Sequence, residues 1–338
     1  MSELKLGLAQ GYWGAAPNPN FVEMAQEAEK LGYDSVWSAE AWGNDAFTPL
    51  AWIGAQTETI KLGTAVVQLS GRTPASCAMH ALTLDILSKG RLILGLGVSG
   101  PQVVEGWYGQ PFPKPLARTR EYIDIIRQVL AREAPVTNSG KHYPLPYNGD
   151  NGTGLGKSLK PIVHPLRADI PIYMGAEGPK NIALSTEIAD GWLPLFYNPY
   201  DESVYTESLK NAKPDFEIAQ MVSVNITDDI EAGLLGVKQF LSLYVGGMGA
   251  KGENFHKNLF ERMGYAAEAE QIQQLFMAGK KDEAAQVIPD ELADSLALIG
   301  PKDRIKERLQ AWRDSKVTTL LVATTDKNQL REMAELIL

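Results

Sequence analysis

The sequence predicts an α/β fold in which eight parallel strands alternate with helices, as a closed (β/α)8 barrel or an open doubly wound sheet. Short apolar runs alternate with stretches of helical spacing almost from the first residue to the last. We find no second core and no internal repeat, and large α/β barrels reach 338 residues as one domain. The barrel therefore fits better, and its functional site is expected at the C-terminal ends of the strands.

The individual elements follow from residue periodicity. The apolar runs that predict strands are 4–9, 34–39, 60–68, 91–97, 170–174, 192–196, 219–226 and 317–323. The stretches that predict helices are 20–31, 47–57, 74–87, 115–130, 179–189, 228–245, 289–299, 301–313 and 328–337. Within the single domain 1–338 we expect two insertions, a hairpin or mobile lid at 134–168 and short helices at about 246–288.

Composition and charge exclude several classes of protein. Lys and Arg total 32 against 41 Asp and Glu, a net charge of −9, which argues against nucleic acid and against an anionic membrane surface. No apolar run approaches a membrane span, and the start lacks the basic and apolar regions of a secretory signal. We therefore expect a cytoplasmic protein, and a single cysteine excludes an internal disulfide.

The most informative run is 170–192, IPIYMGAEGPKNIALSTEIADGW. A short apolar strand is followed by a glycine turn at 175–179, and Pro179 suits the first position of a helix. Such a turn points free backbone N–H groups at one spot, and the helix dipole adds about half a positive charge there. The run indicates an anion site such as a phosphate loop, and the alternative is an ordinary strand-to-helix turn.

Gly95 to Gly100 match the G-x-G-x-x-G pattern of dinucleotide-binding loops. A dinucleotide fingerprint follows the first strand of its unit and opens directly into a helix, whereas this one follows the fourth strand and enters a loop. We interpret these glycines as a place where a flat ligand approaches the backbone. The histidines are too scattered for a paired metal site, and Cys77 shares a helix face with Leu84, which predicts a core position.

Three further groups of residues have an ordinary structural alternative. Glu40 follows the second strand among aromatic residues and is either a functional acid or a solvated loop acid. The basic residues of the first insertion either hold an anionic tail or are simply solvated, and they are Lys157, Lys160, His164 and Arg167. The aromatic residues near strand ends either favour a flat or hydrophobic substrate or pack internally, and they are Tyr12, Trp13, Trp42 and Trp107.

Four separated runs resemble the luciferase-like superfamily, and within it the coenzyme F420 (deazaflavin)-dependent oxidoreductases. They are TETIKLGTAVVQLSGRTPA (57–75), LDILSKGRLILGLGVSG (84–100), IPIYMGAEGPKNIALSTEIADG (170–191) and IPDELADSLALIGPKD (288–303). They are most similar to the methylenetetrahydromethanopterin reductase branch, and also to actinobacterial F420-dependent oxidoreductases of unassigned substrate. The resemblance extends over nearly the whole chain and implies a (β/α)8 TIM barrel.

The resemblance also implies which residues bind the cofactor. In F420-binding members the third strand ends in a bulge with a non-proline cis peptide behind the deazaflavin ring, and the phosphate lies on the loop at 175–179. The acid of the second strand lies near the deazaflavin, so Glu40 is the candidate catalytic residue, as a proton-handling or ring-tuning group. The matching positions are Glu40, Ala65, Val66, Gly97, Ser99, Gly175, Ala176, Gly178 and Pro179, with the cis bond at Ala65–Val66.

Two departures from the family pattern bear on the substrate. The tetrahydromethanopterin reductases carry carboxylates on the first strand and after the fourth, where this chain has Ala9 and Gly100. The resemblance therefore implies an F420-dependent oxidoreductase that passes a hydride between deazaflavin C5 and a different small organic molecule, bound under the insertions. The alternatives are an FMN-dependent luciferase-like monooxygenase or a non-catalytic flavin-binding protein. We also expect a homodimer without metal, and the direction of transfer stays open.

Overall fold

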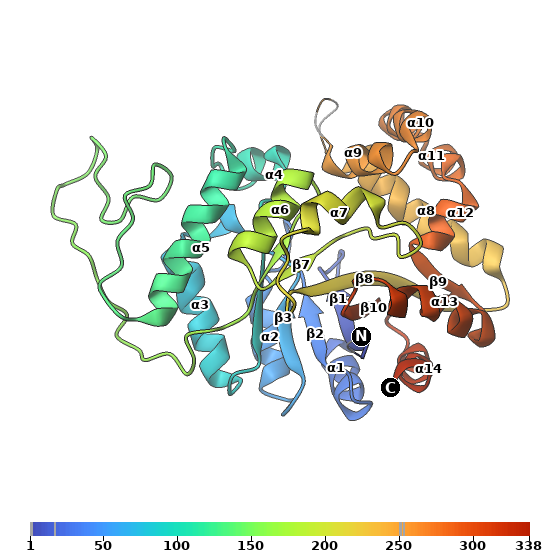
Figure 1. The fold of residues 1–338 in the computed structure, drawn as a ribbon, viewed down its shortest axis with the longest axis horizontal. Coiled ribbons are helices and arrows are strands. Elements are labelled where there is room, and N and C mark those ends of the chain that lie inside the picture. The colour runs from blue at the N-terminus through green and yellow to red at the C-terminus, as the bar shows by residue number, and fades with distance from the viewer. Residues whose placement is uncertain (1–2, 17, 250–251, 253) are drawn as a thin grey trace.

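The strands form one parallel sheet that closes on itself into a barrel (Figure 1). The computed structural model describes residues 3–16, 18–249, 252 and 254–338. The sheet closes because the last strand pairs in parallel with the first strand on one side and with the long strand 217–226 on the other. The predicted closed barrel is therefore confirmed, and the open doubly wound alternative is excluded.

The strand bounds differ from the predicted ones mainly at the ends. The strands are β1 Lys5–Gly11, β2 Ser35–Ser38, β3 Lys61–Thr64, β4 Val67–Gln68, β5 Leu92–Gly97, β6 Ile172–Gly175, β7 Gly191–Leu193, β8 Glu217–Ile226, β9 Ala297–Gly300 and β10 Thr319–Ala323. The barrel uses all of them except β9, which pairs outside it with the second half of β8. β3 and β4 together occupy one strand position, since both pair with β5.

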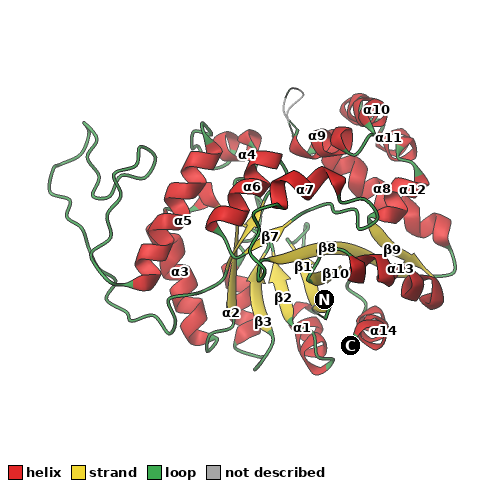
Figure 2. Ribbon diagram, in the orientation of Figure 1, coloured by secondary structure: helices red, strands yellow, loops and turns green. Residues whose placement is uncertain are grey.

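Helices surround the barrel and cover the outer face of the sheet (Figure 2). The helices are α1 Phe21–Lys30, α2 Phe47–Gly54, α3 Pro74–Leu87, α4 Pro101–Gly106, α5 Pro115–Ala131, α6 Pro179–Ile188, α7 Ser203–Leu209, α8 Ile230–Gly247, α9 Phe255–Arg262, α10 Ala266–Met277, α11 Lys281–Val287, α12 Asp290–Ser295, α13 Lys302–Asp314 and α14 Lys327–Ile337. None of these helices, in the described part of the chain, is long and apolar enough to cross a membrane.

Two separate apolar cores hold the fold together. The larger core lies between the sheet and the helices. The smaller core fills the barrel and consists of Ala9, Trp37, Ile93, Tyr173, Leu193, Ala219 and Leu321. Most strands of the barrel supply both cores because their successive side chains point to opposite faces of the sheet, and this explains why they read as continuous apolar runs; these strands are β1, β2, β5, β6, β7, β8 and β10.

Three predicted elements differ from the structure, each for an identifiable reason. The predicted strand 192–196 ends at Leu193, because Pro194 has no N–H to donate to the sheet. The predicted strand 60–68 is divided into β3 and β4 by the bulge at residues 65–66. The predicted helix 289–299 ends at Ser295, and Ala297–Gly300 forms a strand because its buried apolar residues pair with the exposed edge of β8.

The first insertion runs outside the barrel rather than over it. Residues 132–171 leave the end of α5 and return to the start of β6, and their loops project beyond α5 (Figure 1). An isolated antiparallel bridge between Asn138 and Leu145 is the only pairing in the segment, in line with the hairpin expected there. The carboxylate of Glu121 on α5 accepts hydrogen bonds from the backbone of residues 141–143, which attaches the segment to the outer side of that helix.

Candidate functional site

The bulge between β3 and β4 brings together three of the predicted cofactor positions. The Ala65–Val66 peptide bond is cis, which confirms the expectation from the sequence. The side chain of Val66 lies against the ends of two neighbouring strands. A Cβ atom added to Gly97 would lie 2.5 Å from Val66 Cγ2, and one added to Gly175 would lie 3.1 Å from Val66 Cγ1. The glycines at these positions therefore allow the bulge to sit at the mouth of the barrel.

The glycine-rich run after β5 accommodates the bulge rather than a dinucleotide. A Cβ at Gly95 would lie 1.8 Å from the carbonyl oxygen of Thr64, so this position has no room for a side chain. The strand is followed by Ser99 in the left-handed region, with φ of +59°, and by α4, a helix of six residues that the sequence analysis took for loop. The space beside Gly95 is thus filled by the chain itself, and the approach of a flat ligand to Gly97, at the end of the strand, stays a prediction.

The loop between β6 and α6 has the geometry expected of an anion site. Gly178 is the N-cap of α6 with extended dihedral angles, and Pro179 occupies the first turn. A Cβ built on Gly178 has no atom within 4 Å, so the space in front of the helix is open. The loop is held from behind, because the indole of Trp192 donates to the carbonyl of Ala176 at 2.8 Å. The helix dipole therefore faces an open space at the mouth.

The second insertion supports the same loop through Glu177. The side chain of Glu177 turns onto α9, where its Oε2 lies 2.7 Å from Nδ1 of His256, and the two side chains are 10% and 19% exposed. Arg262, at the end of α9, donates to the carbonyl oxygen of Glu177 at 2.8 Å. Burial lowers the pKa of Arg262, although the charge of Glu177 opposes that effect. The side chain of Glu177 thus lies against His256, and the backbone of the loop is bonded to Arg262.

Glu40 lies at the mouth but is fully engaged by its neighbours. Its oxygens lie 2.8 Å from Nη1 and 2.8 Å from Nη2 of Arg72, and it also accepts from the backbone N–H groups of Gln68 and Ala46. Burial disfavours the charge on Arg72, but the hydrogen bond and charge of Glu40 outweigh it and raise the pKa of Arg72. The carboxylate joins the loop after β2 to β4, directly beyond the bulge.

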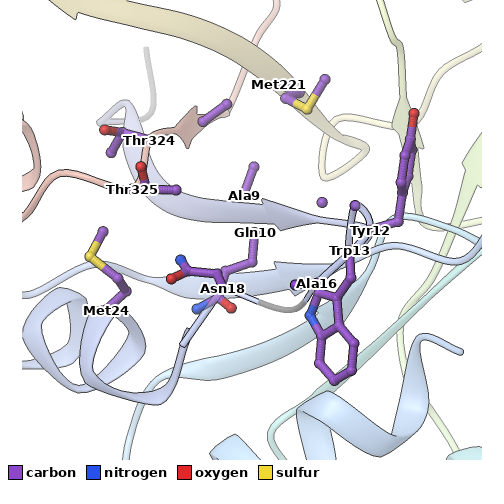
Figure 3. A pocket seen from close by; sticks show the side chains of 13 residues that line it. Ala9, Gln10, Tyr12, Trp13, Ala16, Asn18, Met24, Met221, Thr324 and Thr325 are labelled. Carbon is purple, nitrogen blue, oxygen red and sulfur yellow. The ribbon is translucent and has the colours of Figure 1, made fainter. Parts of the chain in front are cut away.

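A cavity of about 530 Å³ opens where β1 and β10 end, beside the middle of β8 (Figure 3). The residues that line it are Ala9, Gln10, Gly11, Tyr12, Trp13, Gly14, Ala16, Asn18, Met24, Met221, Ala323, Thr324 and Thr325. No described residue of either insertion is among them, so a substrate site under the insertions stays a prediction that this cavity does not test. The segments after β1 and β10 enclose the cavity, because the ends of parallel barrel strands meet at one face.

Some of the remaining predicted residues line the cavity, and others lie elsewhere in the fold. Tyr12 and Trp13 line the cavity, whereas Trp42 and Trp107 are exposed and do not. The basic cluster does not gather at the mouth, because Arg167 pairs with Asp85 at 2.8 Å and donates to Leu92, at the opposite end of β5 from Gly97. Cys77 is buried, as predicted, and burial raises its pKa to about 12.

Sequence reasoning missed the residues that support the site from distant parts of the chain. Arg262 contacts the anion loop from 85 residues away, and Arg72 contacts Glu40 from 32 residues away. Met221, Thr324 and Thr325 complete the cavity. Met221 lies within the predicted strand 219–226, and the only signal of the two threonines was their place just after the predicted strand 317–323. A search for polar residues just after each strand would have found the two threonines.

Comparisons with known proteins agree on one family. The luciferase-like monooxygenase family profile matches residues 7–319. A protein of Mycobacterium tuberculosis, provisionally named a coenzyme F420-dependent oxidoreductase, is 56% identical over 343 residues, which cover 99% of each chain. The 5,10-methylenetetrahydromethanopterin reductase of Archaeoglobus fulgidus is 28% identical and covers 88% of this chain and 87% of its own.

Solved structures show the same fold at lower identity. The coenzyme F420-dependent tetrahydromethanopterin reductase of Methanopyrus kandleri superposes with a TM-score of 0.79 at 23% identity, over 99% of each chain. An F420-dependent secondary alcohol dehydrogenase superposes with a TM-score of 0.71 at 16% identity, over 99% of this chain and 98% of its own. At these identities the structural likeness shows the fold alone.

Proposed function

Because the chain belongs to the luciferase-like monooxygenase family, we propose that it is a coenzyme F420-dependent oxidoreductase acting on a small organic molecule. The observation that carries the proposal is the convergence of Val66, Gly97 and Gly175 at one point of the mouth, beside an open helix N-terminus. A bulge next to an anion loop suits a ligand with a flat ring and a phosphate. The near full-length similarity to the mycobacterial relative favours F420 among such ligands.

The residues present fit such a cofactor. The phosphate would lie at Gly175, Ala176, Gly178 and Pro179, where the space before α6 is open and the loop is fixed from behind by Trp192. The ring would rest on the Ala65–Val66 bulge, with Gly97 and Ser99 beside it. When bound, the deazaflavin exchanges a hydride at C5, and the protein contributes orientation, a grip on the phosphate and exclusion of water.

We assign Glu40 to ring positioning rather than to proton transfer. Its carboxylate already accepts two hydrogen bonds from Arg72 and two from backbone N–H groups. These four contacts hold both carboxylate oxygens against the protein rather than toward a substrate. Because Gln68 follows the bulge directly, the Glu40–Arg72 pair fixes the surface on which the ring would rest.

The test of the proposal is a titration of the full-length protein with F420 and with FMN, followed by turnover with reduced F420. We expect F420 to quench or shift fluorescence with micromolar affinity, FMN to bind at least tenfold more weakly, and candidate substrates to reoxidise reduced F420. Tighter binding of FMN would favour a luciferase-like monooxygenase instead. Binding of F420 without turnover on any carbonyl, alkene or alcohol substrate would favour a flavin-binding protein without catalysis.

We also propose that two copies associate through α2 and α3. These helices pack together and expose Trp52, Met79 and Leu87, which are 61%, 65% and 70% accessible in the single chain. Large apolar side chains at one surface favour association. Light scattering should give twice the monomer mass, and the double variant Trp52→Ser with Leu87→Ser should give the monomer. A monomeric wild-type protein at micromolar concentration would contradict this association.

A further inference from the structure

The cavity at the ends of β1 and β10, beside the middle of β8, has a wall without charge. Its described lining residues are apolar or carry neutral hydrogen-bonding groups, and none is Asp, Glu, Lys, Arg or His. A charged ligand group would lose its hydration there without gaining a counter-ion, which is costly in a partly buried site. The volume, about 530 Å³, lies in the range of roughly 300–1,000 Å³ that small-molecule sites occupy.

The polar and apolar parts of the wall lie on different sides of the cavity. In Figure 3, Gln10, Asn18, Thr324 and Thr325 gather on one side, and Tyr12 and Trp13 lie on the other. The amide nitrogen of Gln10 donates to the carbonyl of Phe21 at 2.5 Å, which fixes the side chain. The amide oxygen of Gln10 is not used by that bond and can accept from a ligand.

The aromatic side of the wall is held in place by a contact with α8. The hydroxyl of Tyr12 lies 3.5 Å from that of Tyr244 on α8. Tyr244 is buried, and burial together with its hydrogen bond with Tyr12 raises the pKa of Tyr244. This contact holds the Tyr12 ring at the edge of the cavity as a flat apolar wall.

The floor of the cavity joins it to the bulge. Ala9 belongs to the core inside the barrel, and Ala65, Val66, Met221 and Ala323 pack against that same core. Ala9, Met221 and Ala323 also line the cavity. A ligand on this floor would therefore adjoin the surface assigned above to the cofactor ring.

We propose that this cavity binds the substrate and that it selects uncharged organic molecules. The selected molecule has a flat apolar body against Tyr12 and Trp13 and a neutral carbonyl, amide or hydroxyl group beside Gln10 and the two threonines. Its role as the substrate site rests on the proposed function, whereas the preference for uncharged ligands rests on the cavity alone.

Three planar probes of nearly equal shape separate charge from size: benzamide, benzoate and benzamidinium. Their affinities are measured with the full-length protein at pH 7 by titration calorimetry and saturation-transfer NMR, with and without F420. We expect benzamide to bind at least tenfold more tightly than either ion. Trp13→Ala should weaken benzamide by at least threefold, which locates the probe in this cavity.

A charge placed at the exposed rim provides the matched test. Thr325→Glu should reverse the order in favour of benzamidinium, while the uncharged Thr325→Gln should keep benzamide first. The proposal is overturned if either ion binds wild type as well as benzamide, if none of the three binds, or if Thr325→Glu leaves the order unchanged. Because the measurements without F420 do not involve the cofactor, a failure of F420 to bind would contradict the proposed function and leave this preference standing.

Discussion

Replacement of Gly178 by Asp separates the proposed anion-binding role of the 175–179 loop from its structural role. A Cβ at this position meets no atom within 4 Å, and the backbone has the extended conformation that any residue adopts at an N-cap. Aspartate is also a preferred N-cap residue, and it is better than glycine by a few tenths of a kcal/mol, with a further contribution from the helix dipole. The variant should therefore fold with unchanged or slightly higher thermal stability.

The same carboxylate should repel an anion bound at the helix N-terminus. Two unit charges about 5 Å apart repel by about 3 kcal/mol at the effective dielectric constant of about 20 that suits a protein surface. Salt screening and rotation of the side chain toward water reduce this value by about half. The remaining repulsion, about 1.4 kcal/mol or more, corresponds to at least a tenfold loss of affinity for F420.

The assay is a fluorescence titration with F420, paired with thermal unfolding of the unliganded protein. Gly178→Asn is the matched control, because asparagine has the same shape and the same capping ability without the charge. We expect Gly178→Asn to bind F420 within threefold of wild type and Gly178→Asp to lose at least tenfold, with neither losing stability. Equal affinities for the two variants would place the phosphate elsewhere and refute the reasoning.

Three other outcomes follow from contacts in the site and the fold. Glu40→Gln removes the carboxylate that Arg72 contacts at 2.8 Å and leaves Asp45, at 3.9 Å, as its ion-pair partner, so it should lower the unfolding free energy by about 2–3 kcal/mol in urea. Adding Arg72→Gln should cost less than the sum of the single changes, and strict additivity would contradict the pairing. Burial tends to raise the pKa of Glu29, but its hydrogen bonds from the backbone of residues 58–60 outweigh this and lower the pKa. The ionised Glu29 carboxylate therefore stabilises the fold above about pH 4.3, and this stabilisation is lost as the pH falls through the lowered pKa of Glu29. Glu29→Gln should flatten the decline of Tm between about pH 5 and 3, and an unchanged slope would contradict this role of Glu29. Finally, Ala9 and Gly100 provide no acid for the pterin reaction, and general acid catalysis contributes about 10²–10⁴-fold to a rate. Methylenetetrahydromethanopterin should therefore not reoxidise reduced F420 at a useful rate. Rapid loss of reduced F420 would overturn this substrate argument.

The parts of the site that depend on local sequence could be predicted, and those that depend on long-range contact could not. The anion loop follows from the glycines and proline of one short run, because a helix N-terminus is built from neighbouring residues. The partners of Glu177 could not be found in this way, since His256 and Arg262 belong to an insertion whose position the sequence does not determine. Glu40 was located correctly, but its ion pair with Arg72 depends on how the loops after β2 and β4 pack.

The least predictable feature of the fold also explains why the second insertion reaches the mouth. β8 is ten residues long, and its second half extends beyond the barrel, where β9 pairs with it. The start of α8 packs there, since a Cβ at Gly233 would lie 2.4 Å from the side chain of Ile299. α8 has 18 residues and spans about 27 Å, so it can run from this outlying edge back to the mouth.

The end of α8 reaches the mouth of the barrel, because Tyr244 in its last turn contacts Tyr12 in the segment after β1. Asn254 then fixes the start of α9 to the end of α8, as its amide donates to the carbonyls of Tyr244 and Val245 at 3.0 and 2.9 Å. α9 is thereby placed behind the anion loop, where His256 faces Glu177. If 289–299 is predicted as one helix, β9 is lost from the fold. The start of α8 far from the barrel axis then has no explanation. The misassigned strand and the two supporting residues that were missed on α9, His256 and Arg262, therefore have a single structural cause.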